Sequence, residues 1–278
     1  MIPPVTIVHA CQRDGRGGSP TAVVDETSLT DAERRAVPVA AGTSHAVFLA
    51  AAGPGTVSLR FFTATGELPA CGHGTVAALA VLAERAGAGA YESVLRSGGR
   101  SFLGRATGGG VRYEAVFDPG PVRVRVPDPV ETAPVLSALG LGPEAPSRVA
   151  SVGRPRLLVR VPDRAALAGL APDLARLRAA CDRLGLLGCY VYSTPGPDGL
   201  AAARMFAPSI GVPEDIANAN STACLAAHLS GQGGSALAVD MGDTLGEPST
   251  VVATTRPGAD GPLVRVGGTA TITGPARW

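Results

Sequence analysis

The chain has 278 residues, a formal net charge of +1 at pH 7, 45% hydrophobic residues and 17% charged residues. This balance is typical of a compact globular protein with one large domain or two lobes. It gives no electrostatic reason to expect nucleic acid or an anionic membrane as a partner. All 24 basic residues are arginine, which excludes a Schiff-base lysine and pyridoxal chemistry.

The cysteines are odd in number and show no CxxC spacing, so neither a zinc site nor a disulfide framework is predicted. No apolar run approaches about 18 residues, and the N-terminus lacks a basic segment followed by an apolar one. We therefore expect a reduced, cytoplasmic protein without a membrane span. The five residues are Cys11, Cys71, Cys181, Cys189 and Cys224, which, apart from Cys71, we interpret as small buried residues.

Short β-like runs dominate the first part of the chain. A helix is predicted over 28–36 from its capped start, and Pro38 is expected to interrupt it. The predicted strands are 4–10, 21–24, 45–50 and 56–62.

The segment Glu67–Thr75 places two glycines, a thiol and an imidazole directly before an apolar helix that ends at Gly87. Glycines allow a ligand to approach the backbone, and the free N–H groups of a helix start can hold a carboxylate. A proton-transfer residue at this rim would face the bound acid. A helix start with structural Cys and His side chains is the alternative.

Strands are predicted at 91–95, 101–106 and 111–117, and the sequence Pro119-Gly120-Pro121 then breaks the chain. We place a lobe boundary there, which gives an N-terminal lobe 1–120 and a C-terminal lobe 121–268. A strand near 269–278 is expected to return to the first lobe.

The second lobe repeats the order of strand, small-polar loop and apolar helix, with the loop at 208–215 and the helix after Asn218. Two such helix starts predict a ligand pocket between the lobes. The further helices are predicted at 134–139, with Pro134 in the first turn, 164–170 and 172–184. The further strands are predicted at 147–152, 156–161, 189–193, 201–206, 236–241, 250–254, 263–266 and 269–272, the last four separated by glycine turns.

Three segments resemble motifs of the PhzF-like (phenazine biosynthesis-like) family, within the diaminopimelate epimerase-like fold. These are Glu67-Leu68-Pro69-Ala70-Cys71-Gly72-His73-Gly74-Thr75, Arg204–Asp215, and Ser19–Val24. The resemblance spans nearly the whole chain and implies an α+β fold of two similar lobes, each a β-barrel or curved sheet around a central helix. It also implies proton-transfer chemistry on small carboxylic acids, no cofactor or metal, and a homodimer.

Three segments depart from the family's pattern, one of them the family's G-R-P, which reads Gly246-Glu247-Pro248 here. His45 stands where the family usually carries its catalytic glutamate. In the second lobe, Asn220 stands where the family has a serine, and it lies near the place of the second cysteine of the related racemases. Because an amide cannot serve as a base, a two-thiol racemase is not expected. An imidazole with a pKa near 6.5 keeps the capacity for proton transfer, so we favour a catalytic His45 over an inactive space-filling one.

The predicted catalytic residues are His45, His73 and Asp215. His9 and His228 are interpreted as packing residues. The predicted substrate-binding residues are Cys71, Gly72, Gly74, Thr75, Asn220, Ser221 and Thr222.

The leading hypothesis is a cofactor-independent isomerase that moves a proton, and with it a double bond, in a small unsaturated or cyclic carboxylic acid. The composition and the resemblance favour antibiotic metabolism, with an alkylidene-pyrroline carboxylate as one candidate substrate. The alternatives are epimerisation of an amino or imino acid, and a non-catalytic protein that binds small acids.

Overall fold

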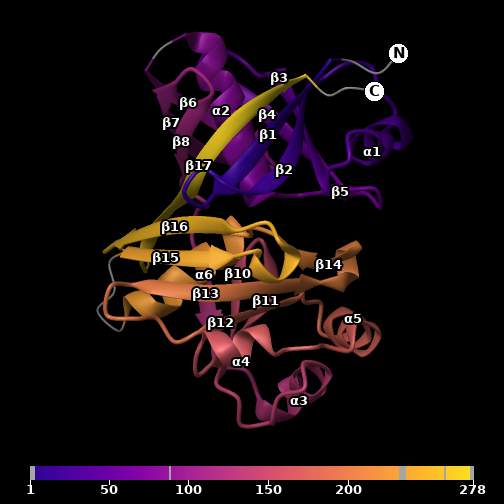
Figure 1. Cartoon of the computed structure of the whole chain (residues 1–278), viewed down its shortest axis with the longest axis vertical. Helices are drawn as coiled ribbons and strands as arrows, with labels where there is room; N and C mark the ends of the chain where they lie inside the picture. Colours follow the sequence, from indigo (N-terminus) through magenta and orange to yellow (C-terminus); the bar gives the residue numbers. More distant parts are fainter. Residues whose placement is uncertain (1–3, 88, 232–235, 260, 276–278) are drawn as a thin grey trace.

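The computed structural model describes residues 4–87, 89–231, 236–259 and 261–275. It is an α+β structure of two lobes, one above the other in Figure 1, and each lobe is a curved sheet around one helix. The predicted fold class is confirmed. Among the described residues, no helix is long and apolar enough to cross a membrane.

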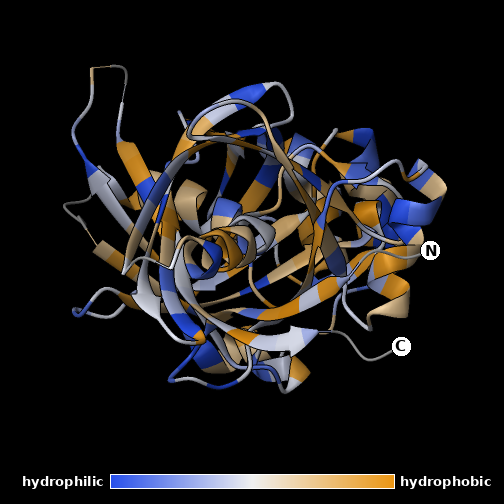
Figure 2. Ribbon diagram, turned by 90° about the horizontal axis from the view of Figure 1, so that it is seen from above, coloured by the Kyte–Doolittle hydropathy of each residue, from blue (hydrophilic) through white to orange (hydrophobic). Residues whose placement is uncertain are grey.

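The first lobe is a closed barrel of eight strands, which pair in the order β1–β2–β3–β4–β6–β7–β8–β17 and back to β1. Figure 2, seen from above, shows a helix end-on inside a ring of strands; this helix is α2 (Gly72–Ala86). The strands are β1 Val5–Gln12, β2 Ser19–Asp25, β3 His45–Ala51, β4 Thr56–Phe62, β6 Ala90–Ser97, β7 Arg100–Gly109, β8 Arg112–Phe117 and β17 Leu263–Pro275, and β5 Glu67–Leu68 pairs with β4.

The second lobe is an eight-stranded sheet in the order β9–β10–β11–β12–β13–β15–β16–β17, curved around α6 (Ala219–Ser230). Its strand directions repeat those of the first lobe: β11–β12 and β13–β15 are parallel, as are β2–β3 and β4–β6. The added strands are β9 Arg123–Arg125, β10 Ser147–Val152, β11 Arg154–Val161, β12 Cys189–Ser193, β13 Leu200–Ala207, β14 Val212–Asp215, β15 Ala236–Met241 and β16 Ser249–Arg256.

Strand β17 belongs to both lobes. Its first part pairs with β16 from Leu263 to Gly267, and its later part pairs with β8 and then with β1 as far as Pro275. The prediction of two strands separated by a glycine turn is therefore wrong. Gly267 continues the strand because a Cβ there would lie 1.9 Å from the Ala115 carbonyl oxygen, so only glycine lets the two strands come this close. The lobe boundary near residue 120 stays a prediction.

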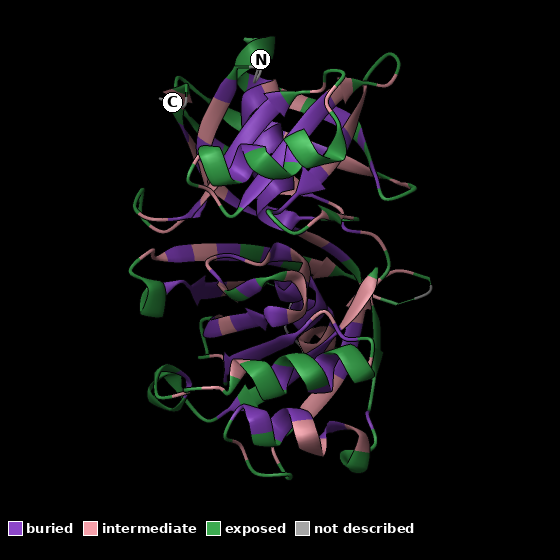
Figure 3. Ribbon diagram, turned by 90° about the vertical axis from the view of Figure 1, so that its right-hand side faces the viewer, coloured by how far each residue is buried: buried purple, intermediate pink, exposed green. Residues whose placement is uncertain are grey.

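The two central helices are buried over most of their length because small and apolar side chains predominate around them. In α2, every residue from Gly72 to Val81 is buried, and Leu79 packs against Gly104 of β7. Figure 3 shows this contrast: the central helix of the upper lobe is purple, whereas surface helices present green, exposed faces. The small side chains of α2 allow the barrel strands to close tightly around it.

Two proline expectations were wrong. Helix α1 (Asp31–Ala40), capped by Thr30 and Glu33, continues through Pro38, which lies in its last turn, where a missing N–H costs one hydrogen bond. Helix α3 (Pro129–Ala138) starts earlier than expected, with Pro129 in its first turn and Pro134 inside. The other helices are α4 Arg164–Ala168, α5 Leu174–Arg183 and the short 3-10 helices η1 Pro208–Ile210 and η2 Asp243–Leu245.

Candidate active site

The N-termini of α2 and α6 meet between the lobes. A Cβ added to Gly72, the first residue of α2, would lie 3.1 Å from the backbone nitrogens of Ala219 and Asn220, which begin α6. The first N–H groups of a helix have no carbonyl partner within it, and they carry the positive end of its dipole. Two such ends at one place are suited to holding a carboxylate; that they do so stays a prediction from the sequence.

The two helices are capped in the same way. The Cys71 Sγ accepts a hydrogen bond from the Gly74 N–H at 3.4 Å, and the Asn218 Oδ1 accepts one from the Ser221 N–H at 2.9 Å. By this shared role, Asn218 rather than Asn220 is the counterpart of Cys71 in the second lobe. The counterpart is still an amide, so the second lobe offers no thiol at this place.

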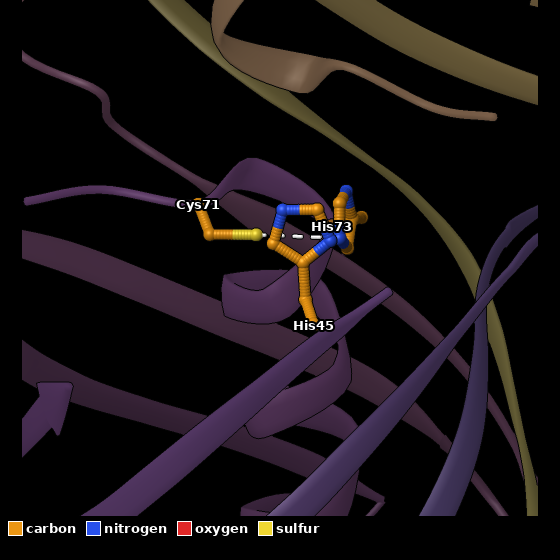
Figure 4. Close-up of side chains that lie close together, drawn as sticks. All are labelled: His45, Cys71 and His73. Atoms are coloured by element: carbon orange, nitrogen blue, oxygen red, sulfur yellow. Dashed lines mark hydrogen bonds between the residues drawn. The ribbon is translucent and has the colours of Figure 1, made fainter. Parts of the chain in front are cut away.

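His45 and His73 lie edge to face at the rim of this site, with ring centroids 4.4 Å apart and an interplanar angle of 80°. His45 begins β3 and its Nδ1 lies 2.9 Å from the Ser44 Oγ, whereas His73 lies in the first turn of α2. The His73 Nδ1 donates to the Ala217 carbonyl at 2.9 Å, and its Nε2 lies 3.3 Å from the Cys71 Sγ. Figure 4 shows the two rings and the thiol converging.

The surroundings shift the pKa values of the two imidazoles in opposite directions. Burial, with the charge of His73, lowers the pKa of His45 well below 6.5, so His45 is neutral at neutral pH. Burial alone would also lower the pKa of His73. Electrostatic interactions with Cys71 and Asp215, with hydrogen bonds to Cys71 and the Ala217 carbonyl, outweigh it and raise this pKa to about 10. A neutral imidazole beside a charged one is the arrangement of a general base and a general acid.

Asp215 is buried beside His73, with its Oδ1 3.9 Å from the His73 Nδ1, and its Oδ2 accepts a hydrogen bond from the Asn218 amide at 2.9 Å. Burial raises the pKa of this carboxyl, while the His73 charge and the Asn218 hydrogen bond oppose the rise. The predicted polar loop at 208–215 contains the 3-10 helix η1 and then β14, which pairs with β13.

A two-contact ion pair holds β14 in place. The Arg204 Nε and Nη2 donate to the two carboxylate oxygens of Glu214 at 2.9 and 2.8 Å, and its Nη1 donates to the Leu170 carbonyl at 2.8 Å. Because Glu214 directly precedes Asp215, this pair fixes the position of the segment that carries Asp215.

His45, His73 and Asp215 line one cavity of about 140 Å³ between the lobes, together with Cys71 and Asn220. This volume suits a small ligand. A larger hollow of about 590 Å³ lies beside His228 in the second lobe. It lacks the paired helix starts and the facing imidazoles, so we assign the site to the smaller cavity.

Three arginines that the sequence analysis missed also line this cavity: Arg100, Arg154 and Arg156. Arg156 is 2% exposed and donates to the Ser221 Oγ at 3.1 Å and to the Arg154 carbonyl at 2.8 Å. Among the described residues, none of the three forms an ion pair with a carboxylate. The sequence did contain a signal for Arg156, because it stands at the start of an apolar strand. A buried charge at such a place requires a partner, and a bound anion can be that partner.

Some predicted substrate-binding residues do not reach the cavity with their side chains. Ser221 and Thr222 are fully buried, the first against Arg156 and the second 2.7 Å from the Tyr190 hydroxyl. The Thr75 hydroxyl donates to the Cys71 carbonyl at 2.8 Å, and Gly74 lies against Phe61. Their positions give them structural roles at the two helix starts.

The chain is similar to known proteins over its whole length. A family model described as "Phenazine biosynthesis-like protein" matches residues 8–274. The chain is 29% identical to the uncharacterized isomerase YddE of Salmonella typhimurium, with 100% of this chain and 99% of that protein covered. It is 30% identical to the trans-2,3-dihydro-3-hydroxyanthranilate isomerase of Pseudomonas aeruginosa, with 72% and 70% covered.

Among solved structures, a predicted epimerase from Pseudomonas aeruginosa is 26% identical and gives a TM-score of 0.83, with 99% of both chains covered. The sequence and structure comparisons therefore indicate the same family as the motifs around Cys71 and Asp215 do. The chain belongs to the phenazine biosynthesis-like PhzC-PhzF family.

Proposed function

We propose that the protein is a cofactor-independent isomerase that moves a proton, and with it a double bond, within a small unsaturated or cyclic carboxylic acid. One observation carries this proposal. Two buried imidazoles with oppositely shifted pKa values lie edge to face on the wall of a small cavity where two helix N-termini meet.

The cavity has the charge that a carboxylate substrate requires. The backbone N–H groups at the starts of α2 and α6 provide donors, and Arg156 adds a positive charge without an acidic partner among the described residues. Donors fixed in this way also stabilise the negative charge that spreads onto the carboxylate when a neighbouring C–H loses its proton.

The proton then follows a short path. With its Nδ1–H donated to Ser44, His45 has a free lone pair on Nε2 and takes the proton from the substrate carbon. His73, which is charged before the reaction, gives a proton to another carbon of the same acid. Transfer of the extra proton from His45 to His73, whose ring centroids are 4.4 Å apart, restores the starting state without a cofactor.

The named activities of relatives support an isomerase, because two similar proteins are named trans-2,3-dihydro-3-hydroxyanthranilate isomerases. We extend the proposal to a substrate of antibiotic metabolism, with an alkylidene-pyrroline carboxylate as a candidate beside the dihydroanthranilate. A homodimer and a cytoplasmic location stay predictions from the family resemblance.

Epimerisation at the α-carbon of an amino or imino acid is the second candidate, favoured by the similarity to a predicted epimerase. It would need the same base, His45, and a proton donor on the opposite face of the carbon. Asn218, at the counterpart position of Cys71, cannot supply a proton in this way. We therefore rank double-bond migration first.

The test uses the purified protein, candidate acids in D₂O, and two readouts. Deuterium incorporation by NMR reports proton transfer, and a change in the ultraviolet spectrum reports double-bond migration. Exchange with inversion of configuration and no spectral change would assign an epimerase instead. His45→Ala should abolish turnover, while His228→Ala, an imidazole outside the cavity, should not. Equal turnover by the parent and His45→Ala would disprove the assigned base, and no turnover of any acid by the parent would favour a binding protein.

A further inference from the structure

The site also contains three buried side chains that can ligate a metal. His45, Cys71 and His73 each present one ligand atom, and these atoms lie within 4.8 Å of one another. The Cys71 Sγ and His73 Nε2 are 3.3 Å apart. Two such donors on a tetrahedral zinc ion are roughly 3.5 Å apart at ordinary Zn–S and Zn–N bond lengths. The distance between these two atoms is therefore already close to that between two ligand atoms on one tetrahedral zinc ion.

The two imidazoles are oriented as metal ligands are. In metal sites, the ring nitrogen that does not ligate usually donates to a carbonyl, a carboxylate or another oxygen. Here the His73 Nδ1 donates to the Ala217 carbonyl and faces the Asp215 carboxylate, and the His45 Nδ1 is held by the Ser44 hydroxyl. In both rings this leaves Nε2 as the nitrogen available for a metal ion.

We propose that His45, Cys71 and His73 bind a divalent cation of the zinc class, with a fourth position open to the 140 Å³ cavity. Two imidazoles and a thiolate suit zinc or cobalt, whereas magnesium and calcium require oxygen ligands. The cation takes the lone pair of His45, and the proton shared by Cys71 and His73 leaves to solvent. A loaded protein then lacks its base and is inhibited; this last consequence rests on the proposed function, while the binding does not.

The sequence pattern alone hides this site. Cys71 and His73 are two residues apart at the start of α2, but His45 comes from β3, and only the barrel brings them together. No zinc site was predicted because the sequence lacks a CxxC motif. That motif identifies only ligands that are close together in the sequence.

The test is a titration of the chelator-treated, full-length protein with Co²⁺, followed by absorption spectroscopy. A 1:1 complex should show a sulfur-to-cobalt charge-transfer band and the visible bands of four-coordinate cobalt, and one equivalent of Zn²⁺ should bleach both. Cys71→Ser should remove the charge-transfer band. Cys224→Ser, which alters a buried cysteine of α6 outside the cluster, should retain it.

A second variant keeps the test decisive if Cys71→Ser does not fold. His45→Gln should weaken cobalt binding by about tenfold or more while it keeps the charge-transfer band, since even loss of an outer-shell partner typically costs 10–100-fold in affinity and His45 is itself a proposed ligand. No band in the parent protein, or a band that persists in folded Cys71→Ser, would overturn the proposal. Because no substrate is needed, these outcomes are independent of the isomerase assignment.

Discussion

A methyl group on Gly72 would lie 2.6 Å from the Cβ of Ala219, so the two helix starts touch where a side chain has no room. Gly72→Ala must therefore move α2 away from α6 and widen the gap between the two helix starts. We expect it to lower the free energy of unfolding by about 1–3 kcal/mol, the usual cost of overpacking, and to reduce turnover as well. Urea unfolding measures the first effect. Gly142→Ala is the control, because a Cβ there meets nothing within 4 Å.

The pH dependence of kcat/KM should have a broad plateau around neutrality. Activity requires neutral His45, so it falls on the acid side, with a midpoint below 6.5 because the pKa of His45 is lowered. Activity also requires charged His73, so it falls on the alkaline side near pH 10, where that residue loses its proton. A rate profile from pH 4 to 11 measures both limbs. An acid limb at or above 6.5 would contradict the assignment of His45 as the buried neutral base.

Substitutions at position 45 should separate the loss of a base from the loss of a side chain. His45→Gln retains hydrogen bonding but not basicity, and we expect kcat to fall by about 100- to 10,000-fold. His45→Glu introduces the carboxylate that the family resemblance places here, and it should recover part of this loss with an altered acid limb. Deuterium exchange into the substrate measures both variants. Equal activity of His45→Gln and His45→Glu would show that proton transfer does not pass through this residue.

Arg156→Gln should raise KM more than it lowers kcat. A hydrogen bond to a charged group contributes about 1.5–3 kcal/mol, so the expected increase in KM is roughly 10–100-fold. Arg160→Gln, in the separate hollow of the second lobe, is the matched control. Circular dichroism and thermal unfolding establish whether the variant is folded, because Arg156 also supports Ser221. An unchanged KM in folded Arg156→Gln would place the substrate's carboxylate away from this arginine.

The Arg204–Glu214 pair should act through position rather than contact. The side chains are only 11% and 10% exposed, so loss of one partner leaves the other charge buried and unpaired. Arg204→Met should therefore destabilise the protein by about 3 kcal/mol, and Arg204→Met combined with Glu214→Leu should recover part of it. The free energies of unfolding in guanidinium of the parent, the two single variants and the double variant give the coupling energy of the pair in a double-mutant cycle. Additive losses would show that the pair has no coupling energy.

Much of this architecture could be predicted from local patterns. The apolar helices with small-polar starts, the repeated order of elements and the place of His73 follow from short segments with strong signals, whereas His45 was placed in the site by the family resemblance. Proline positions were misleading, because the cost of Pro38 depends on how near it lies to the helix end. Arg156 was missed because its importance comes from burial opposite α6, which depends on contacts between elements far apart in the sequence.

The shared strand β17 has a consequence for how the protein is made. Strand β17 pairs with both β1, where Thr6 lies opposite Pro275, and β8. The N-terminal barrel therefore cannot close until β17 has been synthesised and has left the ribosome. Pairing between strands this far apart in the sequence slows folding, because the entropy of closing a long loop is lost before the stabilising contacts form. A product truncated before Leu263 would leave β1 and β8 as two open edges, each ready to pair with another nascent chain.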